Sequence, residues 1–132
     1  MKKILIVEDN ETTALTLGRL LKHRGYEVKA AADAIGALEC ALRFEPDLVI
    51  LDISIPGGNG FTVAEKIQKL VPRPVHLFFL TGGTGPGLQE RAGALGAVDF
   101  FQKPCPTTEL LERIQDTLEG RLRDSRKEVY VL

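Results

Sequence analysis

Three carboxylates of this sequence stand directly after two apolar segments. Glu8 and Asp9 follow residues 3–7 (KILIV), and Asp52 follows residues 48–51 (LVIL). Continuous apolar runs of this length are typical of strands that are covered on both faces of a parallel sheet. In open α/β sheets, the binding crevice lies at the carboxyl ends of the strands. The three carboxylates are therefore candidates for chemistry or for a metal site.

Acidic groups that converge on one edge of a sheet repel each other unless a cation lies between them. No histidine or cysteine is near these acids in the sequence, so the expected cation is one that prefers oxygen, Mg²⁺ or alternatively Mn²⁺. Mg²⁺ keeps waters and shares its remaining positions with a phosphate. Thr81 and Lys103 also stand at the ends of predicted strands. A metal, an ammonium and a hydroxyl around one carboxylate suit phosphoryl transfer to that carboxylate.

Composition limits the classes of protein to consider. At 132 residues, with 44% apolar and 27% charged residues, the chain has the size and composition of one soluble globular domain. A net charge of −1 gives no electrostatic reason to expect nucleic-acid or membrane binding. Cys40 and Cys105 do not make a disulfide framework and favour a reducing compartment. With no apolar run near the ~18 residues of a membrane span, the prediction is a cytoplasmic domain.

Apolar spacing and turn residues divide the chain into alternating strands and helices. Leu42 and Leu70 fall among the residues that the helical spacing turns inward. Strands are predicted at residues 3–7, 26–31, 48–51, 75–80 and 97–101. Helices are predicted after a cap at Asn10, after a cap at Asp33 through Phe44, over 61–71, over 88–95, and after a cap at Thr107 or Thr108 with Leu122 in register.

This alternation predicts an α/β fold with a doubly wound, five-stranded parallel sheet and right-handed crossovers, a flavodoxin-like three-layer sandwich. The strand order 2-1-3-4-5 places the first and third strands side by side, so the three carboxylates would share one rim. Residues 53–60 form a loop of turn residues. Residues 82–87 contain four glycines and one proline, which predicts a mobile loop followed by a short helix.

In their order, these residues resemble the response regulator receiver domain of two-component signalling, the CheY-like family. The matching positions are Glu8-Asp9, Asp52 followed by Pro56 and Gly60, Thr81, and Lys103-Pro104. Each motif alone is common, but five of them in order, each at a strand end, make a specific match. The resemblance covers residues 2 to about 120 and implies a receiver domain over 1–123. A charged tail or linker start is then expected over 124–132, and the initial Met-Lys-Lys suggests a natural start of the chain.

The resemblance implies a role for each residue of the predicted rim. Asp52 is the phosphoacceptor, Asp9 is a direct Mg²⁺ ligand, and Glu8 binds the ion directly or through water. The backbone carbonyl of Ser54 is the remaining protein ligand.

The resemblance also implies the parts of a switch. Thr81 is the switch hydroxyl, and Lys103 is the partner of the phosphoryl group, followed by a cis bond to Pro104. Phe100 matches the switch aromatic of the family, where tyrosine is frequent. Without a hydroxyl, its inward and outward rotamers differ by burial alone.

By the same resemblance, a histidine kinase or a histidine phosphotransfer protein donates the phosphoryl group to Asp52. The surface of the fourth helix, fifth strand and fifth helix then changes, and an output partner binds it. The chain is expected to be a monomer or weak dimer. It is not expected to be an enzyme beyond its own phosphoryl uptake and slow autodephosphorylation.

Three other functions were weighed against this one. A nucleotide site at 82–87 lacks the G-x-x-x-x-G-K-[ST] order of a P-loop. A haloacid-dehalogenase-like phosphatase needs a second acid two residues after the nucleophile, where this chain has Ser54. A receiver-like interaction module that never accepts phosphate is the alternative that stays open.

Overall fold

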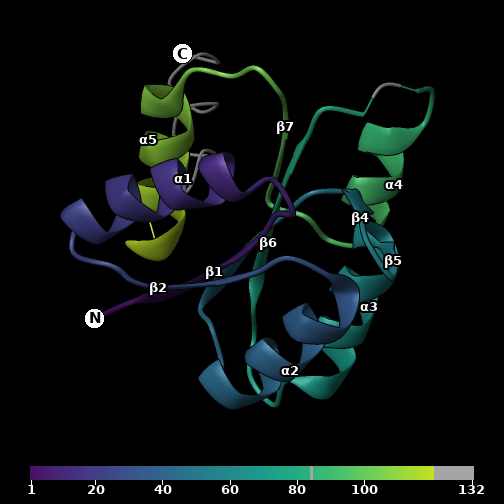
Figure 1. The fold of residues 1–132 in the computed structure, drawn as a ribbon, viewed down its shortest axis with the longest axis horizontal. Coiled ribbons are helices and arrows are strands. Elements are labelled where there is room, and N and C mark those ends of the chain that lie inside the picture. Colours follow the sequence, from purple (N-terminus) through teal and green to yellow (C-terminus); the bar gives the residue numbers. More distant parts are fainter. Residues whose placement is uncertain (84, 121–132) are drawn as a thin grey trace, which may run out of the picture.

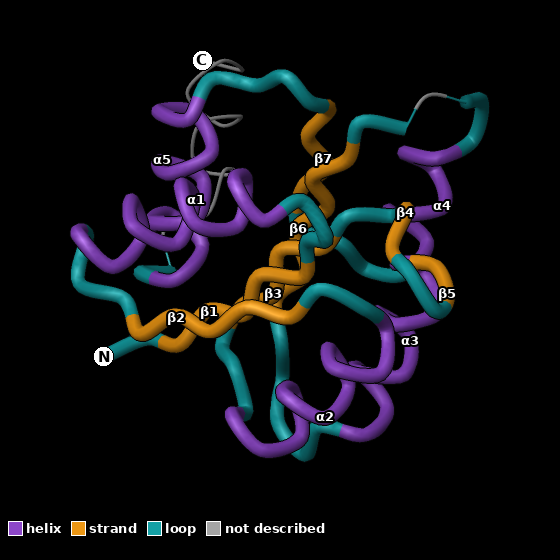
Figure 2. The backbone as a smooth tube through the Cα atoms, viewed as in Figure 1, coloured by secondary structure: helices purple, strands orange, loops and turns teal. Residues whose placement is uncertain are grey.

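The five apolar segments form one parallel sheet at the centre of three layers, in the computed structural model that describes residues 1–83 and 85–120 (Figure 1). Figure 2 shows the strands side by side between two groups of helices. When only the five strands of this sheet are numbered along the chain, their spatial order is 2-1-3-4-5, as predicted. In that spatial order the strands are β2 (Glu27–Ala31), β1 (Lys3–Val7), β3 (Leu48–Leu51), β6 (His76–Thr81) and β7 (Asp99–Gln102).

The register of β1 and β3 brings the ends of these two strands together. Ile4 pairs with Leu48, and the pairing continues in parallel to Val7 and Leu51. The backbone N–H of Asp52 donates to the carbonyl of Val7 at 3.0 Å, which extends the ladder by one residue. The residue that follows each strand is therefore held at the same edge of the sheet.

Helices cover both faces of the sheet, which explains why the strands read as continuous apolar runs. Successive residues of β1 point to opposite faces, so Leu5 packs into one core while Ile4 and Ile6 pack into the other. The helices α1 (Glu11–His23) and α5 (Thr107–Leu118) cover one face, and α2 (Ala34–Phe44), α3 (Gly60–Leu70) and α4 (Leu88–Ala94) cover the other (Figure 1).

Two of the predicted helix caps are confirmed and one is wrong. The side chain of Asn10 accepts from the N–H of Thr13 at 2.9 Å, and that of Asp33 accepts from the N–H of Gly36 at 2.7 Å. The N-cap of α5 is Pro106, with no side-chain cap hydrogen bond, and Thr107 is already helical. The fixed φ of proline leads the chain into the helix one residue earlier than the threonine pattern predicted.

The predicted inward positions of Leu42 and Leu70 are wrong, since their side chains are 47% and 53% exposed. Neighbouring residues take the core positions instead: Phe44 at the end of α2 and Val71 just after α3 are buried. Each residue turns a helix by about 100°, so a face that is one residue off points away from the sheet.

The turn-rich segment before α3 contains a short antiparallel pair, β4 (Ser54–Ile55) and β5 (Gly58–Asn59), where the sequence predicted only a loop. As predicted, α4 is short. Leu122 and the tail over 124–132 lie outside the described residues. Within 1–83 and 85–120, no helix has the length and hydropathy that a membrane span needs.

Candidate functional site

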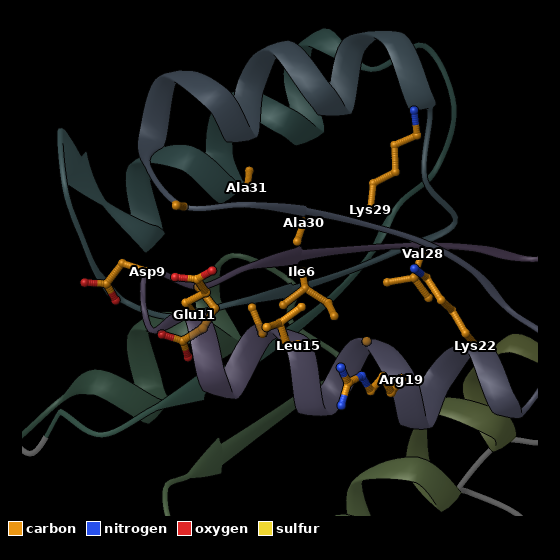
Figure 3. Close-up of a pocket in the computed structure, with 14 residues that line it drawn as sticks. Ile6, Asp9, Glu11, Leu15, Arg19, Lys22, Val28, Lys29, Ala30 and Ala31 are labelled. Carbon is orange, nitrogen blue, oxygen red and sulfur yellow. The ribbon is translucent and has the colours of Figure 1, made fainter.

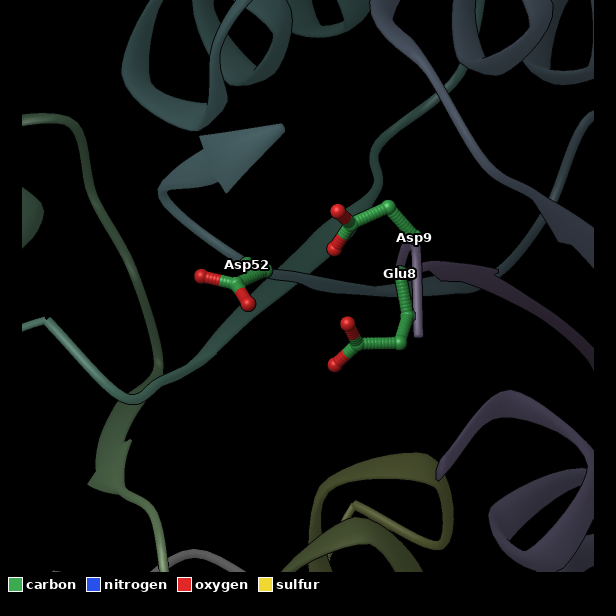
Figure 4. A group of neighbouring side chains, drawn as sticks. All are labelled: Glu8, Asp9 and Asp52. Atoms are coloured by element: carbon green, nitrogen blue, oxygen red, sulfur yellow. The ribbon is translucent and has the colours of Figure 1, made fainter. Parts of the chain in front are cut away.

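The carboxylates of Glu8, Asp9 and Asp52 lie together at the ends of β1 and β3 (Figure 4). One oxygen of each lies within 4.8 Å of the others. Glu8 and Asp52 are buried, with exposed fractions of 5% and 8%, whereas Asp9 is exposed. The predicted clustering of the three acids is therefore present, and the cluster is open to solvent at Asp9.

Lys103 reaches this cluster from the end of β7, the edge strand that lies two positions from β3 in the sheet. It follows β7, and its backbone N–H donates to the carbonyl of Thr81 at 2.8 Å. Its ammonium Nζ donates to Asp52 Oδ2 at 3.1 Å and forms an ion pair with Glu8. The bond between Lys103 and Pro104 is cis, as the resemblance implied. The ammonium thus links the carboxylates at the ends of two neighbouring strands.

Thr81 is fully buried at the end of β6 and holds the second oxygen of Asp52. Its hydroxyl Oγ1 donates to Asp52 Oδ1 at 2.8 Å and accepts from the N–H of Gly83 at 3.1 Å. The N–H of Ser54 also donates to Asp52 Oδ1, at 3.1 Å. Both oxygens of the Asp52 carboxylate therefore have hydrogen-bond donors, which fixes the orientation of the side chain.

The charges in the cluster do not balance within the described residues. Glu8 also accepts from the N–H of Asn10 at 3.0 Å, which orients its side chain. No described side chain forms an ion pair with Asp9. Three carboxylates face one ammonium, so two negative charges are left without a partner. All three acidic groups offer oxygen ligands, and this combination fits a hard divalent cation.

A groove between α1 and β2 leads to this site, as Figure 3 shows. Asp9 and Glu11 line one end of the groove, and Lys22 and Lys29 line the other. An ion from solvent can therefore approach Asp9 along this side of α1.

Two predicted site residues lack the contact that would define their roles. Ser54 contacts Asp52 through its backbone N–H, whereas its assigned role as a metal ligand concerns the carbonyl. Phe100 is half-buried on β7 and packs against the core that α2, α3 and α4 cover. Its role in switching stays a prediction.

Two features of the site were not predicted from the sequence. Gly60 matched the resemblance, but its physical role appears only in the structure: a Cβ there would lie 2.3 Å from the carbonyl oxygen of Asp52. Gln102 carries no predicted role, and its side-chain Nε2 donates to the carbonyl of Gly83 at 3.2 Å. No local sequence signal marks Gln102, because the contact spans 19 residues of chain.

The ammonium of Lys103 is held in its charged form by its neighbours. Burial alone lowers its pKa, but hydrogen bonds and charges from Glu8 and Asp52 outweigh that effect and raise the pKa above the ordinary value for lysine. Because the pKa of Lys103 is higher in the folded state than in the unfolded state, the charged ammonium stabilises the fold. This contribution is fully present below the unfolded-state pKa of about 10.4 and is lost as the pH rises through the folded-state pKa.

We expect Lys103→Met to lower the free energy of unfolding at pH 7 by about 1–3 kcal/mol, because two buried carboxylates lose their partner. The difference from the unsubstituted protein should shrink as the pH rises above about 10. Urea unfolding at neutral and alkaline pH measures both. Lys69→Met is the control, since the Lys69–Glu65 pair is exposed and should contribute little. Equal losses in the two variants would contradict the expectation.

Comparisons with known proteins agree with this geometry. The family model for the response regulator receiver domain matches residues 4–115. The chain is 35% identical over 135 residues to protein-glutamate methylesterase/protein-glutamine glutaminase 3 of Rhodospirillum rubrum, covering 95% of this chain and 36% of that protein. It is 36% identical over 124 residues to the transcriptional activator protein IrlR of Burkholderia pseudomallei, covering 93% and 53%. The chain thus spans about half or less of these relatives.

Several solved structures of similar shape are receiver domains or response regulators. A CheY-like receiver domain protein from Methanospirillum hungatei JF-1 has a TM-score of 0.85 at 30% identity, covering 92% of this chain and 96% of that one. A response regulator from Burkholderia pseudomallei, solved with a phosphorylated aspartic acid, a calcium ion and citrate, has a TM-score of 0.79 at 26% identity, covering 96% and 75%.

Proposed function

Because this chain belongs to the family of response regulator receiver domains, we propose that it is switched by a phosphoryl group on Asp52. The observation that carries the proposal is the set of donors on this buried carboxylate. Lys103 holds one oxygen, and the Thr81 hydroxyl and the Ser54 N–H hold the other. A nucleophile oriented in this way needs little reorganisation when a phosphoryl donor arrives.

In the proposed reaction, a carboxylate oxygen of Asp52 attacks the phosphorus of a phosphohistidine on a histidine kinase or a histidine phosphotransfer protein. The P–O bond forms, the P–N bond breaks, and the imidazole nitrogen keeps the electron pair. The product is an acyl phosphate on Asp52. The ammonium of Lys103 stays beside the developing negative charge, and the Thr81 hydroxyl turns its donor to a phosphoryl oxygen.

The acidic cluster is the proposed Mg²⁺ site. Asp9, Glu8 and Asp52 would hold the ion with their carboxylates, and Ser54 with its backbone carbonyl. The exposed Asp9 and the two uncompensated charges of the cluster support this assignment. When bound there, the ion neutralises negative charge on the phosphoryl oxygens and the carboxylates.

The proposed output is a change of the surface formed by α4, β7 and α5. The phosphoryl group adds up to about −2 charge beside Thr81 and Lys103, and it favours the conformation whose donors face it. Phe100 on β7 fills the space that Thr81 leaves when it moves, and an output partner binds the altered surface.

We extend the proposal to the bounds, the location and the oligomeric state of the domain. Residues 1–123 form the receiver, and 124–132 are a tail or the start of a linker. The domain acts in the cytoplasm, as a monomer or weak dimer, and its only chemistry is uptake and slow loss of its own phosphoryl group. The two relatives named above are a methylesterase and a transcriptional activator, so receivers of this kind serve different outputs.

Labelling with acetyl phosphate, measured as the mass of the intact protein, tests the proposal. The protein should take up one phosphoryl group only with Mg²⁺ or Mn²⁺ present, and a chelator should stop uptake. Asp9→Asn should raise the Mg²⁺ concentration for half-maximal labelling by about tenfold or more. Glu11→Gln, an exposed acid outside the three-carboxylate cluster, is the control and should leave that concentration unchanged. Labelling without a divalent ion, or equal behaviour of the two variants, would contradict the proposal.

A further inference from the structure

We propose that Gln102 is a positioning residue that holds the Thr81 hydroxyl on Asp52 by fixing the backbone of Gly83. This inference rests on the proposed function of Asp52 and adds to it a route by which the exposed edge of β7 controls the site. No sequence motif or assigned role includes this glutamine.

Three hydrogen bonds connect Gln102 to Asp52 in series. Gln102 Nε2 donates to the carbonyl oxygen of Gly83 at 3.2 Å. The N–H of Gly83 donates to Thr81 Oγ1 at 3.1 Å. The Thr81 hydroxyl donates to Asp52 Oδ1 at 2.8 Å. Because the Gly83 N–H donates to the threonine oxygen, the hydroxyl proton of Thr81 is directed to the aspartate.

The sheet itself places Gln102 where it can do this. Gln102 is the register partner of Thr81 in the β6–β7 pair. Its side chain therefore starts beside the end of β6 and reaches the loop that follows this strand. Gly83 and its neighbour Gly82 have no side chains of their own to restrict the loop. A donor from the neighbouring strand supplies a restraint that the loop sequence lacks.

The same contact joins the acidic site to a surface depression between the loop and β7. Gly83, Phe100 and Gln102 line this depression together with Gln89 of α4. Phe100 and Gln102 lie two residues apart on β7, so both belong to one side of the strand. A partner that covers Gln102 and breaks its bond to Gly83 would free Thr81 to turn to a phosphoryl group, and by linkage a phosphoryl group on Asp52 would weaken the bond.

The expected effect is modest, because the side chain of Gln102 is exposed and its bond competes with water. Loss of one such hydrogen bond corresponds to a change of about threefold in an equilibrium constant. Gln102→Met keeps the length of the side chain and removes the donor. Because the relay holds Thr81 in its unphosphorylated position, we expect the variant to strengthen binding of beryllofluoride, an analogue of the phosphoryl group, by about threefold. Gln89→Met is the matched control, since it changes a glutamine of the same depression whose side chain has no hydrogen bond among the described residues.

Amide NMR of the unphosphorylated protein gives a second readout. Gln102→Met should shift the Gly83 amide resonance and speed its hydrogen exchange, whereas Gln89→Met should do neither. In a Thr81→Val background, Gln102→Met should no longer change beryllofluoride affinity, because the relay has lost its middle group.

The outcomes separate this inference from the function on which it rests. If the unsubstituted protein does not bind beryllofluoride, the proposed function of Asp52 fails. If it binds, and Gln102→Met has the affinity and Gly83 amide of the control, the inference is overturned. A loss of affinity, or an equal gain with and without Thr81, also overturns it, because Gln102 would then act by another route.

Discussion

Asp52→Asn is expected to abolish phosphoryl uptake from acetyl phosphate, with a loss of at least about a hundredfold. The amide has nearly the shape of the carboxylate, and its oxygen can still accept from Thr81 and from the N–H of Ser54, which both contact Oδ1. It lacks the negative charge that makes the side chain a nucleophile. It also presents an N–H₂ group or a weaker acceptor to the ammonium of Lys103.

The fold should survive this substitution, which makes the result interpretable. Asp52→Asn removes one of three neighbouring carboxylates, so mutual repulsion within the cluster falls. We expect the urea midpoint to stay level or rise while labelling is lost. Wild-type labelling of the variant would show that another residue is the phosphoacceptor. Loss of labelling together with unfolding would show that Asp52 has a structural role that we do not assign to it.

Gly60→Ala is expected to have the largest effect of any single added methyl group at the site. Its Cβ would lie 2.3 Å from the carbonyl oxygen of Asp52 and 2.8 Å from the Cα of Ile53, and both are backbone atoms. The N–H of Gly60 also donates to the carbonyl of Ile53 at 2.7 Å, which holds the two segments together. One segment must move, and we expect a loss of about 1–3 kcal/mol in the free energy of unfolding.

Gly60→Ala should also reduce labelling by more than its loss of stability explains. The added methyl group presses on the backbone carbonyl of Asp52, so we expect the Asp52 carboxylate to be displaced from the donors of Thr81 and Lys103. Labelling by acetyl phosphate should fall even under conditions where the variant is fully folded by circular dichroism.

Gly18→Ala is the matched control, because Gly18 is also a helical glycine that faces packed side chains. Its Cβ would meet Ile6 Cδ1 at 3.9 Å and Val28 Cγ1 at 4.0 Å, which are ordinary contacts. This substitution should stabilise α1 by up to about 1 kcal/mol and leave labelling unchanged. If Gly60→Ala behaved like Gly18→Ala, close approach of the backbone would not be what requires glycine at position 60.

Local sequence pattern was enough to predict the sheet and the edge at which the candidate site lies. Continuous apolar runs such as residues 4–7 and 48–51 can be satisfied only by burial on both faces, and alternation with helices then requires parallel strands. Since parallel strands end at one edge, the position of Asp52 after its strand was enough to place it near Glu8 and Asp9. These are consequences of local pattern and chain direction.

The sequence placed Thr81 and Lys103 near Asp52 but could not determine which of their atoms meet. That Lys103 bridges Glu8 and Asp52, and that Thr81 takes the opposite oxygen of Asp52, depends on strand register and side-chain reach. The error at Leu42 has the same origin, since a helix face is set by packing against the sheet and not by apolar spacing alone.

The contact of Gln102 with Gly83 and the requirement for glycine at position 60 also exist only in three dimensions. Each depends on distances between segments far apart in the chain, or on backbone atoms brought close by a turn. Such distances are set by the packing of the whole folded chain, so no local sequence pattern could predict them.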